Sequence, residues 1–269
     1  MLRLQVVVTH RARFSRGGGI RVLSCSRRPP VTSAPPRLTY YDELGDDFER
    51  FMSEYDVERR VSLVFHDLLE GGALDGLEVL EVGSGTGRFS RELLKRRARL
   101  TAVDVGVRLA RVVARGAAAT GVAGDACRLP FRDESFDLVL SSECIEHTLD
   151  PEAAIAEMCR VARVGGRVCL TTPNRVWWPA LLVALRLRLR RFDGIESWRY
   201  PSRVVAELAR HSVDQGLTRS GCHLWPFQLA PTRPLLRLID RWGRRLYPVM
   251  INFGVCGRKS HRGVDPAGV

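Results

Sequence analysis

The chain has 269 residues, of which 45% are hydrophobic and 27% are charged. This length suits one α/β domain with appendages, and the composition excludes a collagen-like repeat and wholesale disorder. The longest apolar run, Val176–Leu185, has about half of the roughly 18 residues that a membrane-spanning helix needs. The seven cysteines are widely spaced and form no Cys-x-x-Cys pair. The sequence therefore favours a reducing, cytoplasmic location over a disulfide framework or a structural zinc site.

Positive charge is concentrated at the start of the chain. The net charge is +12, and residues 1–40 hold eight arginines and no Asp, Glu or Lys. Only +4 remains for the rest of the chain, which weakens the case for a nucleic-acid partner. Residues 1–38 also contain Gly-Gly-Gly and Pro-Pro breakers, so we expect a flexible, Arg-rich leader there. Import into an organelle, a disordered tail and a start codon placed too early all remain open for this leader.

Strand and helix signals alternate after the leader. Acidic and aromatic residues, followed by apolar residues at helical spacing, predict cap helices within 39–72. Beyond them the alternation predicts a doubly wound, mostly parallel α/β sheet in one domain over 39–258, with a tail at 259–269. The expected strands are 77–82, 100–104, 122–124, 136–141, 167–172, 217–224 and 250–257. The expected helices are 86–97, 108–118, 151–161, 202–211 and a basic amphipathic stretch at 234–247, and Gly165-Gly166 is expected to form a turn.

The strongest local signal is the segment Glu81–Gly87, which reads Glu-Val-Gly-Ser-Gly-Thr-Gly. It follows a predicted strand and opens a predicted helix. Glycines allow a tight turn and the close approach of a ligand, and a helix N-terminus offers N–H groups that lack partners. The dinucleotide fingerprint needs its third glycine five places after the first, where this chain has Arg88. The glycine pattern alone therefore leaves the ligand open.

This segment resembles the first motif of the class I S-adenosylmethionine-dependent methyltransferases: an acidic residue, one apolar residue, then Gly-x-Gly-x-Gly. Four further segments resemble that family in the same order, so that the likeness covers residues 77–174. These segments are Val103-Asp104, Gly124–Phe131, Ser135–Val139 and Arg163–Arg167. The resemblance implies a Rossmann-like sheet of seven strands whose last hairpin is reversed. It also implies S-adenosylmethionine as the cofactor.

The resemblance carries cofactor roles onto particular residues of this chain. Asp104 ends the second strand, where a carboxylate accepts hydrogen bonds from ribose hydroxyls. Asp125 opens the segment that resembles the adenine-binding part, although taken singly it could be a helix cap. The full set of expected cofactor residues is Glu81, Gly83, Ser84, Gly85, Gly87, Asp104, Val105, Asp125, Ala126 and Ser141. We interpret Asp137 as structural, and Cys127 and Cys144 as packing residues rather than nucleophiles.

A second polar segment, Glu143–His147, follows the fourth predicted strand. His147 is the candidate catalytic residue, because the unperturbed pKa of imidazole lies close to neutral pH and suits a general base. The pattern Glu-x-x-Glu-His also resembles ubiquinone-biosynthesis O-methyltransferases, in which this segment is associated with metal binding. A divalent metal on Glu143, Glu146 and His147 therefore stays open, as does simple hydrogen bonding at a helix start.

Residues 175–200 form an expected insertion on the substrate side of the sheet. Trp177 and Trp178 adjoin the short apolar run, and arginines follow it. This combination suits a membrane interface, an acyl-chain groove or a core-packed helix with a solvated end. The arginines around Trp242 are open to the same interpretations.

Together these patterns predict methyl transfer to a small-molecule acceptor of lipid-like or aromatic character, such as a quinol. A nucleic-acid methyltransferase is an alternative, but the Asn/Asp-Pro-Pro-aromatic segment of amino-base methyltransferases is absent after the fourth strand. A non-catalytic S-adenosylmethionine-binding protein is the other alternative. Peripheral contact with a membrane, the acceptor atom and the oligomeric state stay open.

Overall fold

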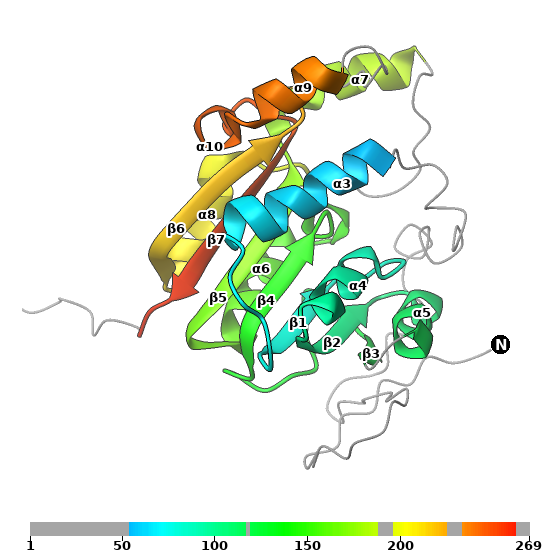
Figure 1. Cartoon of the computed structure of the whole chain (residues 1–269), viewed down its shortest axis with the longest axis vertical. Helices are drawn as coiled ribbons and strands as arrows, with labels where there is room; N and C mark the ends of the chain where they lie inside the picture. The colour runs from blue at the N-terminus through cyan, green and yellow to red at the C-terminus, as the bar shows by residue number, and fades with distance from the viewer. Residues whose placement is uncertain (1–53, 117–118, 188–195, 225–232, 262–269) are drawn as a thin grey trace, which may run out of the picture.

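The computed structural model describes residues 54–116, 119–187, 196–224 and 233–261, and Figure 1 shows a central sheet with helices on both faces. The sheet has seven strands in the order β3-β2-β1-β4-β5-β7-β6. Strands β1 to β5 run parallel, and β7 is antiparallel to both β5 and β6. The predicted fold class is confirmed, including the reversed hairpin. The strands are β1 Glu78–Val82, β2 Arg99–Asp104, β3 Thr120–Ala123, β4 Phe136–Ser142, β5 Ala162–Pro173, β6 Val213–Cys222 and β7 Asn252–Lys259.

Helices pack on both sheet faces and produce two hydrophobic clusters. Helices α6 and α8 cover one face, while η1, α4 and α5 cover the other. The bounds of the helices are α3 Glu54–Ser62, α4 Arg88–Lys95, α5 Val107–Gly116, α6 Pro151–Val161, α7 Trp178–Arg186, α8 Pro201–Arg210, α9 Arg233–Asp240 and α10 Gly243–Leu246. Helix α3 continues into the π-helical segment η1 Leu63–Leu68, and two 3₁₀ turns, η2 Ile145–His147 and η3 Arg175–Trp177, follow β4 and β5.

Several element ends differ from the predicted ones for local reasons. Helix α6 has the predicted bounds, because the Asp150 carboxylate caps it by accepting from the Ala153 N–H at 3.0 Å. Strand β5 starts at Ala162, so the predicted turn at Gly165-Gly166 is wrong. These glycines lie instead at an irregularity in the pairing with β4, and Gly165 has a φ of 77°.

The helix in the predicted insertion is largely exposed. In α7 only Leu181 is buried, while Leu182 and Val183 are 50% and 57% exposed, so the core-packed alternative is wrong. Residues 54–68 are helical, as expected of a cap. The leader 1–38, the first part of the 39–72 segment, residues 188–195 of the insertion and residues 262–269 of the tail lie outside the described residues. In the described part of the chain, no helix has the length and apolar character needed to cross a membrane.

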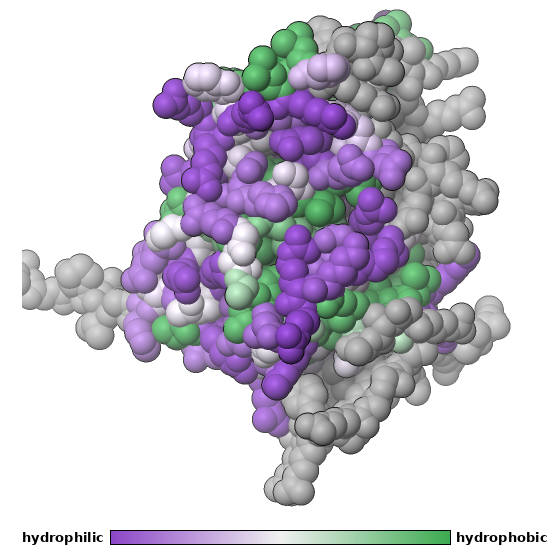
Figure 2. Space-filling model, viewed as in Figure 1, coloured by the Kyte–Doolittle hydropathy of each residue, from purple (hydrophilic) through white to green (hydrophobic). Residues whose placement is uncertain are grey.

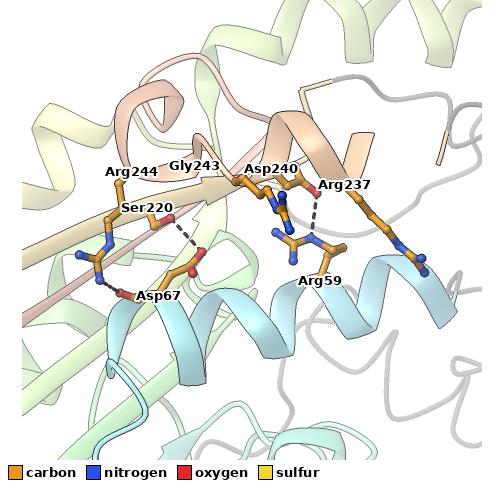
Figure 3. Close-up of a pocket in the computed structure, with 8 residues that line it drawn as sticks. Arg59, Asp67, Ser220, Arg237, Asp240, Gly243 and Arg244 are labelled. Atoms are coloured by element: carbon orange, nitrogen blue, oxygen red, sulfur yellow. Dashed lines mark hydrogen bonds and ion pairs between the residues drawn. The ribbon is translucent and has the colours of Figure 1, made fainter. Parts of the chain in front are cut away.

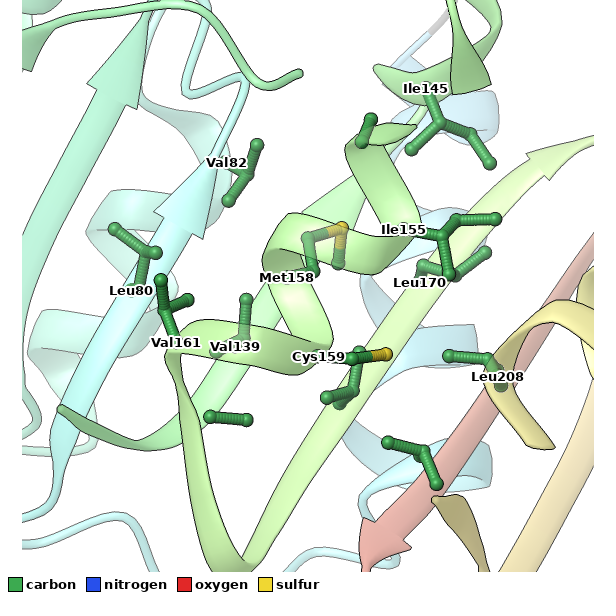
Figure 4. Close-up of a cluster of buried hydrophobic side chains, with 14 of the residues drawn as sticks. Leu80, Val82, Val139, Ile145, Ile155, Met158, Cys159, Val161, Leu170 and Leu208 are labelled. Atoms are coloured by element: carbon green, nitrogen blue, oxygen red, sulfur yellow. The ribbon is translucent and has the colours of Figure 1, made fainter. Parts of the chain in front are cut away.

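The larger hydrophobic cluster lies between α6 and the parallel strands. Figure 4 shows Met158 and Ile155 of α6 directed toward Val139 of β4 and Leu170 of β5. Met158, Val139 and Leu170 are fully buried. Because interiors are packed as densely as organic crystals, each of these side chains is held by its neighbours. This packing fixes β4, and with it the polar segment that follows β4.

We expect Met158→Ala to lower the free energy of unfolding by roughly 2 to 5 kcal/mol, because it removes a fully buried side chain and leaves a cavity. Denaturant titration followed by circular dichroism measures the change. The exposed Glu152→Ala on the same helix is the control and should cost less than about 1 kcal/mol, the scale of a surface ion pair. Equal losses for the two variants would contradict the packing shown for α6.

Candidate functional site

The candidate site lies at the carboxyl ends of β1, β2 and β4. The strand order reverses between β1 and β4, and open α/β sheets place their ligands outside the carboxyl ends of strands at such a switch point. The loop Gly83–Gly87 leaves β1 there and leads into α4. The site is therefore built by the centre of the sheet rather than by a peripheral loop.

Two glycines of this loop have different physical roles. Gly83 has a φ of 76°, and a Cβ on it would lie 2.3 Å from the Sγ atom of Cys144, so only glycine fits. Gly85 has a φ of 49°, but a Cβ there would meet no atom within 4 Å. Between them, the hydroxyl of Ser84 is buried and has no hydrogen-bond partner among the described residues. A buried polar atom beside open space is what a loop that receives a polar ligand would show.

Asp104 connects the ends of β1 and β2. Its Oδ2 accepts from the Gly85 N–H, and its Oδ1 accepts from the Gly106 N–H, each at 2.8 Å. A carboxylate has about four acceptor positions, so these two bonds do not use its full capacity to accept from a ligand hydroxyl. The sequence predicts that Asp104 contacts the ligand. The structure shows that its carboxylate shapes the loop.

Glu81 is buried beneath the loop at 3% exposure. Its carboxylate accepts a hydrogen bond from the Ser90 hydroxyl of α4. Removal from water raises the pKa of Glu81 to about 8, although the Ser90 hydrogen bond opposes this shift, and the negative charge of Asp104 raises the pKa further. The structure thus shows Glu81 anchoring α4 behind the loop, and its expected contact with a cofactor stays a prediction.

The remaining expected cofactor residues meet at the same edge of the sheet. Gly87 leads into α4, Val105 follows β2, and Asp125-Ala126 follows β3. Asp125 is exposed, and its Oδ1 accepts from the Cys127 N–H at 2.9 Å in a local turn where no helix starts. Ser141 is fully buried and stands opposite Val82 in the register of β1 and β4.

The three residues that we interpreted as structural behave in that way. Burial raises the pKa of the Cys127 and Cys144 thiols, which disfavours the thiolate that a nucleophile needs. Cys144 packs against Gly83 instead. Asp137 accepts from the Glu78 N–H at 2.9 Å at the start of β1, away from the carboxyl edge.

The segment after β4 brings His147 close to Glu146. The Nε2 of His147 lies 3.8 Å from the Oε1 of Glu146, and the His147 side chain is 23% exposed. Glu146 is buried, and its Oε2 accepts from the Thr172 hydroxyl at 2.9 Å. Glu143 has a φ of 51°, and its Oε2 accepts from the Asn252 amide at 2.6 Å. Burial raises the pKa of both Glu143 and Glu146, and for Glu143 the charge of Glu146 adds to the shift.

These acids do not assemble a metal site. Among the described residues, no three His, Cys, Asp or Glu side chains lie close enough together to share a metal ion. One carboxylate oxygen of each glutamate is already bonded to Asn252 or Thr172. The donor set therefore does not fit the divalent metal that the Glu-x-x-Glu-His pattern left open.

Sequence reasoning missed a charged group that α3 places beside Glu143. Asp56 lies 2.8 Å from the Nε2 of buried His223 and also pairs with Arg60. Burial works against the charge of Asp56, but these two partners hold the pKa of its carboxyl well below its usual range. The positive charge of Arg60 also acts on Glu143. The Asp56 and Arg60 spacing of four residues was the one sequence signal for this group.

Comparison with known proteins agrees with this geometry. Residues 80–170 match the family model described as a methyltransferase domain. A demethylmenaquinone methyltransferase of Thermobifida fusca is 41% identical over 104 residues, which cover 36% of this chain and 44% of that protein. A malonyl-[acyl-carrier protein] O-methyltransferase of Methylococcus capsulatus is 36% identical over 149 residues, which cover 53% of this chain and 50% of that protein. The chain thus spans about half the length of these relatives.

Two solved structures share the fold with TM-scores of 0.60. An S-adenosylmethionine-dependent methyltransferase of Thermotoga maritima is 19% identical, and the match covers 82% of this chain and 98% of that one. The methyltransferase in a complex with the Trm112 activator of Haloferax volcanii is 14% identical, with the same coverage. At these identities the likeness concerns the fold alone.

The raised pKa of Glu81 predicts how stability depends on pH. Since the pKa rises from 4.5 to about 8 on folding, the folded chain binds more protons between these values, and stability falls as pH rises through that window. Relative to wild type, Glu81→Gln should gain roughly 1 to 3 kcal/mol in free energy of unfolding between pH 5.5 and 8.5. Urea titrations across that range measure the gain. Glu70 is exposed, so Glu70→Gln is the control for the removal of one carboxylate. If the stability of Glu81→Gln depends on pH as that of wild type does, the raised pKa of Glu81 is refuted.

Proposed function

Residues 80–170 match the family model of a methyltransferase domain, and on this premise we propose that the chain transfers a methyl group from S-adenosylmethionine to a small-molecule acceptor. One observation carries the proposal. The loop Gly83–Gly87 lies at the switch point of the sheet with open space at Gly85, and Asp104 holds its backbone from behind. This arrangement places the N-terminus of α4 and a carboxylate where a ligand with both anionic and hydroxyl groups can bind.

The expected cofactor residues fit S-adenosylmethionine in a consistent order along the sheet edge. The start of α4 and the Ser84 hydroxyl would hold the amino-acid part, and Asp104 with Val105 would hold the ribose. Asp125 and Ala126 would border the adenine, while Ser141 closes the site from the β4 side. Glu81 would support the loop through α4. When bound, the cofactor supplies a methyl group that is already activated on a sulfonium.

The part of the site formed by Glu143–His147, which we call the acceptor half, supplies a base. Methyl transfer would form a bond between the acceptor atom and the methyl carbon as the bond from carbon to sulfur breaks, with S-adenosylhomocysteine as the leaving product. For a hydroxyl acceptor, His147 would take the proton, and ionised Glu146, with its Oε1 3.8 Å from the His147 Nε2, would stabilise the resulting imidazolium. Alignment of the reactants is the larger contribution, on the order of 7 kcal/mol or more.

An aromatic or lipid-like acceptor that carries oxygen suits this half of the site best. The Ser197 N–H donates to the Glu146 carbonyl at 2.7 Å, so the next residue, Trp198, lies close to the Glu143–His147 segment. The indole N–H of Trp198 is buried and has no partner among the described residues, so it can donate to an acceptor oxygen. The names of the relatives include a quinone-type and an acyl-type acceptor, and the quinone type agrees with this donor and with the surrounding tryptophans.

Gly85→Ala tests the cofactor half. The added methyl group enters the open space above the loop, so affinity for S-adenosylmethionine should fall about tenfold or more, roughly 1.4 kcal/mol. Titration calorimetry measures the affinity. Gly71→Ala is the matched control, because Gly71 also has a positive φ, 65°, and open space, but lies away from the site. Equal affinities for the two variants would remove Gly85 from the cofactor site.

His147→Ala tests the transfer itself, and separates an enzyme from a protein that only binds the cofactor. In a screen of phenol and quinol acceptors with labelled cofactor, its single-turnover rate should fall by about 10²-fold or more, while its cofactor affinity stays within a few fold of wild type. His211→Ala, at the end of α8, should keep the wild-type rate. A chelator should not lower the wild-type rate. Normal turnover by His147→Ala on an acceptor that the wild type methylates would exclude the base role.

A further inference from the structure

We propose that one end of the molecule is a docking face for a lipid bilayer that contains anionic lipid. The docking face consists of residues 175–187, which include η3 and α7, and residues 233–249, which include α9 and α10. Vesicle binding through this face would require no methyl transfer, so the inference goes beyond the proposed function. Figure 1 shows α7 and α9 at the same end of the molecule, beyond the carboxyl edge of the parallel strands.

Exposed apolar side chains are concentrated in the docking face. Ten large apolar side chains are exposed in the described part of the chain, and eight of them belong to these two segments. Scattered exposed leucines need no explanation, but a cluster indicates an interaction surface. Figure 2 shows apolar side chains at this end of the molecule beside a band of hydrophilic ones. The eight are Val176, Leu182, Val183, Leu187, Leu235, Leu238, Trp242 and Val249.

The charge that surrounds these side chains has one sign. Asp240 is the only acidic residue in the two segments, and it is buried and paired with Arg59 at 2.8 Å. The guanidinium of Arg245 lies 5.2 Å from the centre of the Trp242 ring. Arg244 pairs with the exposed Glu70 at 2.8 Å, and five other exposed arginines accompany the apolar side chains: Arg175, Arg186, Arg237, Arg241 and Arg245. Leucine and tryptophan among arginines, with no accessible acid in the two segments themselves, are complementary to acyl chains beneath anionic headgroups.

The two segments are joined to each other. The Trp177 indole N–H donates to the Val249 carbonyl at 2.8 Å. The Asn174 amide, just before η3, donates to the Pro248 carbonyl at 2.8 Å and to the Met250 carbonyl at 3.1 Å. The two chain segments that carry these exposed side chains are therefore held to each other by hydrogen bonds.

The docking face is also fixed to the body of the domain. Figure 3 shows a cavity of about 190 Å³ between α3, η1, β6 and α9–α10, crossed by polar contacts. Arg59 pairs with Asp240, Ser220 donates to Asp67 at 3.1 Å, and Arg244 donates to the Asp67 carbonyl at 3.0 Å. These contacts hold the inner side of α9–α10, so its outer leucines are exposed by a rigid arrangement. The cavity lies away from the glycine loop and is itself no part of the candidate site.

A bilayer fits this surface better than a protein does. The cores of protein interfaces are depleted of charge, with charged groups at the rim. Here arginines alternate with leucines along α9 and α10. Phosphate headgroups can form ion pairs with the arginines, while the leucines insert among the acyl chains. A second copy of the chain would bring equal positive charges together.

Sedimentation of the full chain with vesicles tests the proposal. We expect binding to phosphatidylcholine vesicles that contain about one third phosphatidylglycerol, and weaker binding to pure phosphatidylcholine. Binding should weaken with added salt, because salt screens the arginines but leaves apolar insertion in place. Equal binding to both vesicle types would exclude the arginine contribution and overturn the proposal.

Two pairs of variants separate this face from the rest of the chain. Leu182→Ser with Val183→Ser should weaken partitioning about tenfold or more, whereas Leu182→Met with Val183→Ile should bind as the wild type does. Arg241→Gln with Arg245→Gln should weaken binding by about fivefold for each arginine. The matched control is Arg97→Gln with Arg210→Gln, whose side chains are 79% and 70% exposed on other elements.

The contrary outcomes are distinct. If the Ser and Gln variants bind vesicles as tightly as wild type, binding comes from other basic residues, such as those of 1–38, and the docking face is wrong. If wild type ignores vesicles but forms a dimer that Leu182→Ser with Val183→Ser dissolves, the face joins two copies of the chain instead.

Discussion

The two hydrogen bonds of the Asp104 carboxylate are the constraint on which the site depends. They join the loop after β1 to the end of β2 through the N–H groups of Gly85 and Gly106. Accepting both bonds favours the ionised carboxylate. Burial raises the pKa of the neighbouring Glu81, and the charge of Asp104 raises it further. Neutral Glu81 can then stay buried with Ser90 as its partner and hold α4 in place. Asp104 thereby arranges the loop, while Glu81, protonated mainly because it is buried, holds the helix behind it.

The acceptor half follows a different logic, because its charged and polar groups come from elements far apart in the chain. Asp56 and Arg60 belong to α3, Glu143 and Glu146 follow β4, His223 follows β6, and Asn252 begins β7. Buried charges cost several kcal/mol each unless partners compensate them. Helix α3 supplies such compensation, since Asp56 pairs with His223 and the charge of Arg60 acts on Glu143. Helix α3 is thus part of the electrostatics of the site.

This difference explains which parts the sequence could predict. The glycine loop, Asp104 and the capped start of α6 are local features, in which neighbouring residues decide the conformation. Sequence spacing could not reveal the pairing of Asp56 with His223, because it depends on how α3 lies against the end of β6. The irregularity at Gly165 was missed because a Gly-Gly pair serves a turn and a strand irregularity equally well. For α7, an apolar run fits a core helix and an exposed face alike, and only tertiary packing shows that Leu181 alone is buried.

The two ends of the proposed docking face continue directly into the acceptor half. Helix α7 follows β5 through Asn174, and α10 leads into β7 at Asn252, whose amide bonds to Glu143. Asn174 in turn bonds to the carbonyls of Pro248 and Met250 just before β7. Asn174, the turn that carries Pro248 and Met250, and Asn252 therefore connect α7 and α10 with Glu143 by hydrogen bonds and short stretches of chain. If the docking face lies on a bilayer, the carboxyl edge of the sheet lies next to the lipid surface. An apolar acceptor could then reach His147 with little of its surface exposed to water. Each CH₂ group that stays out of water lowers the free energy of the acceptor by about 0.8 kcal/mol. The same geometry gives a water-soluble acceptor no such advantage, so the placement of the face favours lipid-like acceptors over small polar ones.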